Sequence, residues 1–317
     1  MKNAYRTWLS LSDEFFAAYA SWHTSGQYAG EERYATIEEC KSDPPVRERD
    51  DYYQEELDVV TRHFRRFKGA RVLEIGTGDG NLTWKVARLA HHVESWDIDP
   101  IAITVADIRL RSLGVENVTL RVKDAQTAGE ELRETFDVIC FVQVLEHLPA
   151  ALQGPFYDRV LSMTAPGGCI FISTPNRWHP RDSHDTGKYF VHWLPRAIKI
   201  PLARAFGWGI EGHDPCWSHP PILHDYVSYR WLVSRARKCW GQVRSSEMSF
   251  FPTSAEWRLA RRSAGGGASF ARGAIAWVGR FLNLNYFFGD KVILQRPATD
   301  SLRGSRVGEK GSGLPSE

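Results

Sequence analysis

The 317-residue sequence has no long hydrophobic run, no closely paired cysteines and no strong charge of either sign. No apolar stretch approaches the roughly 18 residues that a transmembrane helix needs, and no apolar segment near residue 1 predicts a signal peptide. The five cysteines show neither CxxC nor metal-binding spacing, so we expect reduced thiols. A net charge of +2 gives no general attraction for nucleic acid or an anionic surface. These absences predict a cytoplasmic, globular protein.

The chain divides by composition into three parts. Residues 1–52 predict a helical extension, because aromatic side chains recur at helical spacing after Ser12. Residues 53–296 predict one domain, interrupted by insertions at 174–221 and 254–283. Residues 297–317 are rich in Gly, Ser and charge and lack aromatics, which predicts a disordered tail.

From residue 71 onward, short apolar strands alternate with amphipathic helices. We expect strands at 71–75, 92–97, 118–122, 137–142, 169–173, 241–251 and 291–294, and helices from 81, from 100, at 155–163 and at 222–238. Pro166, Gly167 and Gly168 predict a turn before the fifth strand. This alternation predicts an α/β fold, namely a Rossmann-like, doubly wound, mostly parallel seven-stranded sheet with helices on both faces and a helical, aromatic cap.

The first strand leads into Gly76-Thr77-Gly78-Asp79-Gly80. Three glycines at alternate positions allow a tight turn and let the backbone approach a ligand closely. In open α/β sheets, ligands lie outside the carboxyl ends of the strands, so the residues that follow each strand are the candidate site. The glycine spacing is GxGxG, and Asn81 stands where a dinucleotide-binding GxGxxG would have its third glycine.

Two further motifs lie downstream in the expected order. Residues 136–139 (FDVI) are followed by residues 145–149 (LEHLP), and residues 166–168 (PGG) precede the fifth strand. With the glycine motif, they make residues 71–176 resemble the class I S-adenosylmethionine-dependent methyltransferases. The resemblance implies methyl transfer from S-adenosylmethionine, with S-adenosylhomocysteine as product.

The resemblance also implies roles for the residues at the strand ends. The carboxylate of Glu74 attracts the ammonium group of the methionyl part, Asp97 accepts hydrogen bonds from both ribose hydroxyls, and Ile98 covers the adenine. Asp124 accepts from the adenine amino group, although its alternative role as the cap of a turn stays open. The full expected cofactor-binding set is Glu74, Gly76, Thr77, Gly78, Gly80, Asp97, Ile98, Asp124, Ala125, Val142 and Gln143.

Glu146 and His147 are the expected catalytic residues. A neutral imidazole takes a hydroxyl proton near pH 7, so His147 is a candidate general base, and its alternative is a structural histidine in the loop. The sequence is similar to ubiquinone-biosynthesis O-methyltransferases and to small-RNA 2′-O-methyltransferases, whose members can carry ExxEH, which implies a divalent metal. Here Gln143 replaces the first acid, so no metal site is predicted. The alternative set is Glu146 and His147 with His179, His184 or His192.

The predicted function is methyl transfer to a small-molecule acceptor, at oxygen. The alternatives are a metal-assisted RNA 2′-O-methyltransferase, an N- or C-methyltransferase of a natural product or sugar, a nicotinamide-dependent oxidoreductase, and a non-catalytic domain that binds the cofactor as a scaffold. The (D/N)PP(Y/F) tetrapeptide of many enzymes that methylate amino groups of nucleic acids is missing at 143–145. Nucleic acid is therefore not the expected partner.

The insertion at 174–221 is rich in aromatic residues and predicts an apolar cap over the acceptor. The expected cap residues are Trp178, Tyr189, Phe190, Trp193, Trp208 and Trp217. Residues 194–208 form a basic amphipathic piece, which predicts either an ordinary lid helix, the favoured interpretation, or peripheral contact with a membrane surface.

Overall fold

The computed structural model describes residues 11–25, 36–42, 57–58, 69–182, 184–206, 224–247 and 291–298. Within these ranges, seven strands form one sheet in the order β3-β2-β1-β4-β5-β7-β6. The strands are β1 (Arg71–Ile75), β2 (His92–Asp97), β3 (Val118–Val122), β4 (Phe136–Val142), β5 (Thr164–Ser173), β6 (Arg244–Glu247) and β7 (Lys291–Gln295). The pairs among β1 to β5 are parallel, and β7 runs antiparallel to both β5 and β6. The predicted mostly parallel seven-stranded sheet is confirmed.

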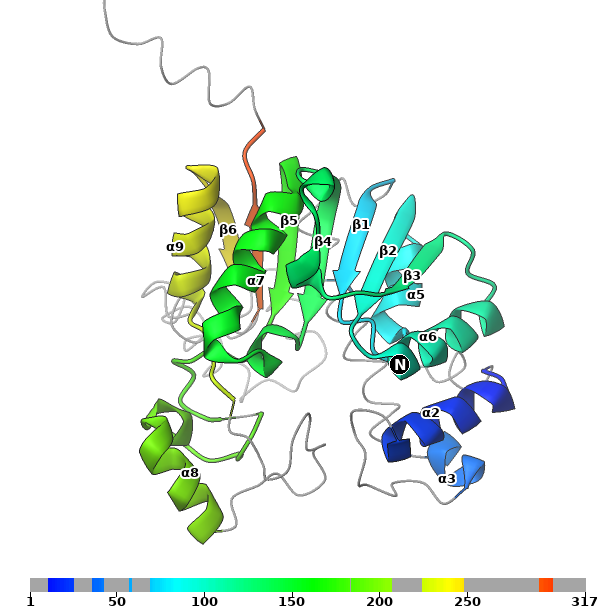
Figure 1. Ribbon diagram of the computed structural model, residues 1–317, viewed down its shortest axis with the longest axis horizontal. Helices are drawn as coiled ribbons and strands as arrows, with labels where there is room; N and C mark the ends of the chain where they lie inside the picture. The colour runs from blue at the N-terminus through cyan, green and yellow to red at the C-terminus, as the bar shows by residue number, and fades with distance from the viewer. Residues whose placement is uncertain are drawn as a thin grey trace, which may run out of the picture.

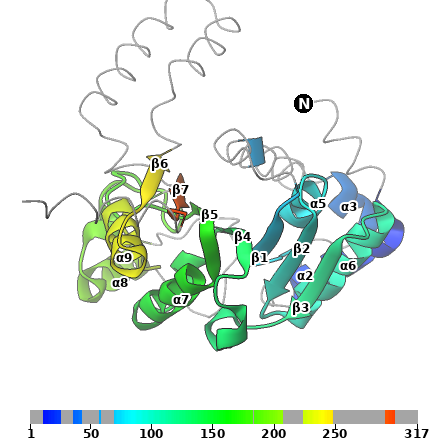
Figure 2. The same cartoon turned by 90° about the horizontal axis from the view of Figure 1, so that it is seen from above.

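Helices cover both faces of this sheet (Figures 1 and 2). On one face, α7 (Ala150–Met163) and α9 (Tyr229–Trp240) bury Tyr157 and Leu232 in one apolar cluster with Phe141 of β4. On the other face, α5 (Asn81–Ala87) packs Leu82 against the strands, and α6 (Pro100–Ser112) contacts β2, β3 and α5. The near-continuous apolar runs of β1 and β4 follow from this burial on both sides.

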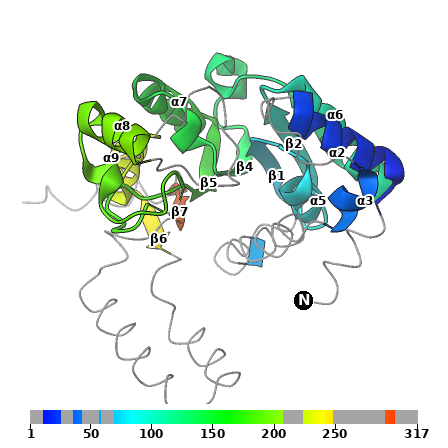
Figure 3. The same ribbon diagram turned by 90° about the horizontal axis from the view of Figure 1, so that it is seen from below.

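The N-terminal helices pack onto α6. In α2 (Asp13–Ser25), Phe15, Phe16 and Tyr19 are buried in one cluster with Ala102 and Val105 of α6. The short α3 (Ile37–Ser42) lies beside α2 (Figure 3). The aromatic residues whose spacing predicts this helix therefore also form the apolar face by which α2 packs on α6.

The strand order reverses between β1 and β4, and this is where a doubly wound sheet binds its ligand. The carboxyl ends of β1, β4 and β5 point toward the side of the molecule that carries α2 and α8 (Arg196–Ala205) (Figure 1). The short 3₁₀ helices η1 (Ala125–Thr127) and η3 (Leu145–His147) also follow carboxyl ends, whereas η2 (Glu130–Leu132) lies before β4 and η4 (Val191–Trp193) before α8.

Several boundaries differ from those predicted, among them the start of β6 at Arg244 rather than 241. Helix α7 begins at Ala150 rather than 155, because the carbonyl of Pro149 already accepts from the next turn, and Pro155 lies inside the helix. The expected turn at 166–168 is an irregularity within β5, where the pairing with β4 shifts register. Helix α9 begins at Tyr229 rather than 222, because the Ser228 side chain accepts from the Trp231 N–H and caps it.

Several predicted segments lie outside the described residues: the insertion at 254–283, Trp208, Trp217 and most of 297–317. Among the helices that are described, none combines the length and hydrophobicity needed to cross a bilayer.

A buried ion pair joins the glycine loop to α6. The Arg109 guanidinium donates to the Asp79 carboxylate at 2.7 Å and to the Asp79 carbonyl at 2.7 Å. The two side chains are 2% and 10% exposed. Arg109 also lies over the Phe15 ring, 4.5 Å from its centre, so one guanidinium links loop, α6 and α2.

Arg109→Met should strongly destabilise the protein, because it leaves the Asp79 carboxylate buried without its partner. We expect a loss of roughly 3–5 kcal/mol in the free energy of unfolding, measured by urea denaturation. Arg111→Met is the matched control on the same helix, since its pairs with Asp107 and Glu14 are exposed and the expected loss is under about 1 kcal/mol. Equal losses in the two variants would contradict this assignment.

Candidate active site

In the loop after β1, glycines let the backbone pass close to the loop after β4 and to α6. Gly76 has φ +85°, and a Cβ there would lie 2.5 Å from Cγ2 of Val144 in the loop after β4. Gly80 has φ +75°, and a Cβ there would lie 3.0 Å from Cα of Ala106 in α6. Gly78 has φ +53° as well. A side chain at Gly76 or Gly80 would therefore force apart the elements that shape the loop.

Glu74 lies beneath this loop, fully buried. Its Oε2 accepts from Thr83 at 2.6 Å and from Ser95 at 2.7 Å, and Ser95 also bonds the Thr77 hydroxyl at 2.7 Å. Its Oε1 is buried with no hydrogen-bond partner among the described residues. Burial raises the pKa of Glu74 to about 7. The structure thus places Glu74 as an anchor between β1, β2 and α5, and its contact with a ligand ammonium stays a prediction.

Asp97 ends β2 beside the loop. Its Oδ2 accepts from the Gly78 N–H at 2.9 Å and its Oδ1 from the Asp99 N–H at 2.9 Å, while burial raises its pKa. Each oxygen retains a lone pair for a further donor, which suits two neighbouring hydroxyls. Ile98 follows with 52% of its surface exposed, so its side chain is accessible, and its contact with adenine stays a prediction.

The loops after β3 and β4 hold the remaining expected cofactor residues. Asp124 caps η1 by accepting from the Gln126 N–H at 2.8 Å, so its alternative capping role is present, and Ala125 is buried. Val142 is buried at the end of β4. Gln143 has φ +56°, and its N–H donates to the Ser173 carbonyl at 2.8 Å. This left-handed residue turns the chain sharply toward Glu146.

Five polar residues meet beyond β4, and we call them the acceptor-side cluster: Glu146, His147, His184, Asp185 and His224. His147 Nδ1 lies 3.1 Å from His224 Nε2, and His224 Nδ1 lies 2.5 Å from Asp185 Oδ1. His184 Nδ1 lies 2.9 Å from the same Asp185 oxygen. Glu146 accepts from the Thr174 hydroxyl at 2.9 Å and lies 3.9 Å from His184 Nε2.

Burial and neighbouring charges set the protonation of this cluster. Burial raises the pKa of Glu146, and burial with the adjacent His224 lowers the pKa of His147 to about 3, so His147 is neutral at physiological pH. Burial by itself would raise the pKa of Asp185 and lower that of His184, but their hydrogen bond and the neighbouring opposite charges together outweigh it, so the pKa of Asp185 falls and that of His184 rises. The cluster therefore combines the neutral imidazole of His147 with the ionised carboxylate of Asp185.

Of the three histidines named as alternative partners, the structure brings only His184 to Glu146 and His147. The His179 ring bonds the carbonyl of Arg181, and the His192 ring packs against Tyr226. His224 and the Asp79–Arg109 pair were missed by sequence reasoning. His224 follows His147 by 77 residues, and no local motif marks it.

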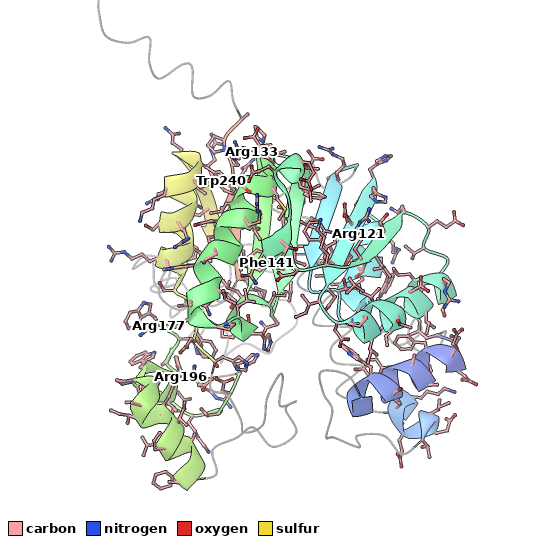
Figure 4. All side chains as sticks on the ribbon, in the orientation of Figure 1. Arg121, Arg133, Phe141, Arg177, Arg196 and Trp240 are labelled. Atoms are coloured by element: carbon pink, nitrogen blue, oxygen red, sulfur yellow. The ribbon has the colours of Figure 1, made fainter. Side chains whose placement is uncertain are left out.

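Four of the six expected cap residues lie within the described part of the chain. Trp178, Tyr189, Phe190 and Trp193 pack on one another, yet they are 39–64% exposed. Helix α8 is tied to the cluster, since buried Lys199 donates to the His224 carbonyl at 2.9 Å. Arg196 on the same helix pairs with Asp225, and Figure 4 shows Arg177 and Arg196 together on this side of the molecule. Two of the basic side chains of α8 are thus engaged internally, and membrane contact stays a prediction.

The buried Glu74 should make stability fall as pH rises. Its folded pKa of about 7 exceeds the ordinary 4.5, so its stabilising contribution is present below about pH 4.5 and is lost as pH rises through 7. Glu74→Gln stays uncharged at every pH and should remove this dependence. Between pH 5 and 8, urea denaturation of the ligand-free protein should show a decrease up to about 3 kcal/mol larger in wild type than in Glu74→Gln. Parallel pH profiles would count against a protonated Glu74.

Comparison with known proteins identifies a matching family model and several relatives. A family model described as a methyltransferase domain matches residues 66–213. A ubiquinone biosynthesis O-methyltransferase of Chelativorans sp. (strain BNC1) is 32% identical over 202 residues, covering 56% of this chain and 74% of the relative. One from Rhizobium etli is 30% identical over 188 residues, covering 54% and 70%.

A solved S-adenosylmethionine-dependent methyltransferase from Mesorhizobium loti is 14% identical, with 73% of this chain and 92% of that chain covered. Its TM-score of 0.44 adds nothing to what the sheet order shows. The relatives matched over more than two thirds of their length, together with the glycine loop and Asp97, decide the family: the chain belongs to the class I S-adenosylmethionine-dependent methyltransferases.

Proposed function

We propose that this methyltransferase acts on a hydroxyl oxygen of a small molecule. The observation that carries the proposal is the acceptor-side cluster, which begins three residues after Gln143 and lies at the carboxyl ends of the strands. The relatives named above are O-methyltransferases, which supports oxygen as the methylated atom.

The cofactor, S-adenosylmethionine, supplies a methyl group on a sulfonium that is already a good leaving group. The chain's own residues have three tasks. The glycine loop and Asp97 hold the methyl donor. Glu146 and His147 place the acceptor oxygen in line with the methyl group and bind the hydroxyl hydrogen. During transfer the O–C bond forms as the S–C bond breaks, and the hydroxyl proton passes to Nε2 of the neutral His147.

Glu146 and His147 are the proposed catalytic residues, in contact with the acceptor hydroxyl. His147 is held by His224 on its Nδ1 side, which leaves Nε2 for the acceptor. Glu146 is held by Thr174 on Oε2, which leaves Oε1. Methyl transfer is direct, so the reaction needs no covalent nucleophile from the chain.

A screen of paired acceptors tests the proposal. Each phenol is assayed beside the aniline of the same skeleton, with labelled S-adenosylmethionine and product identification by mass spectrometry. We expect methyl ethers, and we expect His147→Ala to slow their formation roughly a hundredfold while affinity for S-adenosylhomocysteine is unchanged. His179→Ala, which alters a histidine outside the cluster, is the control. N-methyl products, or full activity in His147→Ala, would refute the proposal.

A further inference from the structure

Trp22 reaches from the N-terminal extension to the residues that follow β2. It lies near the end of α2, and only 2% of its surface is exposed. Its indole N–H donates to Asp99 Oδ2 at 2.9 Å, although 77 positions separate the two residues in the chain. A buried indole N–H usually finds a hydrogen-bond partner. Here that partner stands two residues after Asp97, the acid expected at the cofactor ribose.

Asp99 is held on both of its carboxylate oxygens. Its Oδ1 accepts from the Ile101 N–H at 2.8 Å and caps α6, and its Oδ2 accepts from Trp22. A helix cap needs only one side-chain oxygen, so the indole bond is additional to the cap and ties Asp99 to α2. The backbone N–H of Asp99 in turn donates to Asp97 Oδ1 at 2.9 Å. The position of Asp99 therefore sets the position of one donor to Asp97.

The other oxygen of Asp97 is bonded by a second residue near Trp22. Asp97 Oδ2 accepts from the Gly78 N–H at 2.9 Å. A Cβ at Gly78 would lie 4.0 Å from Cη2 of the Trp22 ring, which is van der Waals distance. Trp22 thus lies beside two residues whose N–H groups hold the Asp97 carboxylate, one on each oxygen.

We propose that Trp22 is a positioning residue of the cofactor site. Through Asp99 and Gly78 it fixes the Asp97 carboxylate in the orientation that accepts from the ribose hydroxyls. A carboxylate that is already held in place loses less conformational freedom when the ligand binds, and this raises affinity. The inference rests on the role expected of Asp97, and it goes beyond the proposed function because it does not depend on which acceptor is methylated.

The alternative is that Trp22 only attaches α2 to the domain. It shares one apolar cluster with Phe16 of α2 and with Ala102 and Val105 of α6. Attachment alone predicts that changes at Trp22 lower the stability of the protein. Positioning predicts in addition a loss of cofactor affinity, and that loss should depend on Asp97.

Binding of labelled S-adenosylhomocysteine, measured by equilibrium dialysis, tests the inference without an acceptor. Trp22→Phe retains an aromatic ring in the cluster and removes the indole donor. We expect affinity to fall roughly tenfold, the size of effect that follows from losing a hydrogen bond to a charged group. Phe16→Leu is the matched control, because it reduces the same packing but removes neither contact of Trp22 with Asp99 and Gly78. It should bind as wild type even where its melting temperature falls.

A double-mutant cycle separates positioning from attachment. If Trp22 acts through Asp97, Trp22→Phe lowers affinity roughly tenfold in wild type but less than about twofold in Asp97→Ala, because the carboxylate is then missing. Attachment alone would give the same factor in both backgrounds. Circular dichroism checks that each variant is folded, and Asp97→Ser replaces Asp97→Ala if the latter is not.

Three results would overturn the inference: wild-type affinity in folded Trp22→Phe, an equal loss of affinity in Phe16→Leu, or an equal factor in both Asp97 backgrounds. Undiminished binding by Asp97→Ala would overturn it as well, and would also remove Asp97 from the cofactor site. A loss confined to Asp97→Ala would refute the role of Trp22 and leave that of Asp97 intact. Methylation at a hydroxyl oxygen is tested separately, by the screen of paired acceptors.

Discussion

The close approach of bare backbone to neighbouring elements is the constraint on which this structure depends. At the carboxyl ends of β1 and β4, a Cβ at Gly76 would lie 2.5 Å from the Val144 side chain, and one at Gly80 would lie 3.0 Å from Ala106 of α6. Because the Gly76–Val144 contact brings the loops after β1 and β4 together, the glycine loop and the loop that carries Glu146 and His147 become neighbours. A side chain at Gly76 would push these two loops apart.

Buried polar groups then fix the position of that loop. Glu74 joins β1, β2 and α5 from below, and the Asp79–Arg109 pair joins the loop to α6 and, through Phe15, to α2. Trp22 of α2 also donates to Asp99 at 2.9 Å. The N-terminal extension is thus bonded to the residues that follow β1 and β2, which ties its packing to the shape of the cofactor site.

The sheet could be predicted from the sequence because its signals are local. Each buried strand is a short apolar run, and Asp99 with Pro100 marks the start of α6 at the residue where the structure begins it. The residues at the strand ends could be named because parallel strands place all their carboxyl ends at one edge. Asp97 and Gly78 meet there, although 19 residues separate them in the chain.

The acceptor-side cluster could be predicted only in part, for a physical reason. His147 and Glu146 lie in a recognisable loop, but their partners come from an insertion and from the segment before α9, whose course depends on tertiary packing. Of the three candidate histidines His179, His184 and His192, only the fold could select His184, which it does through Asp185. His224 carries no sequence signal at all, and it is the residue that orients His147.

Calorimetric titration of Gly76→Ala with S-adenosylhomocysteine tests the central claim most directly. Gly114→Ala is the matched comparison, since Gly114 also has positive φ (+65°) but no atom within 4 Å of its Cβ position. If backbone approach at Gly76 forms the cofactor site, Gly76→Ala loses at least roughly tenfold in affinity, about 1.4 kcal/mol, while Gly114→Ala binds as wild type. Equal, undiminished affinity in two folded variants would contradict the account.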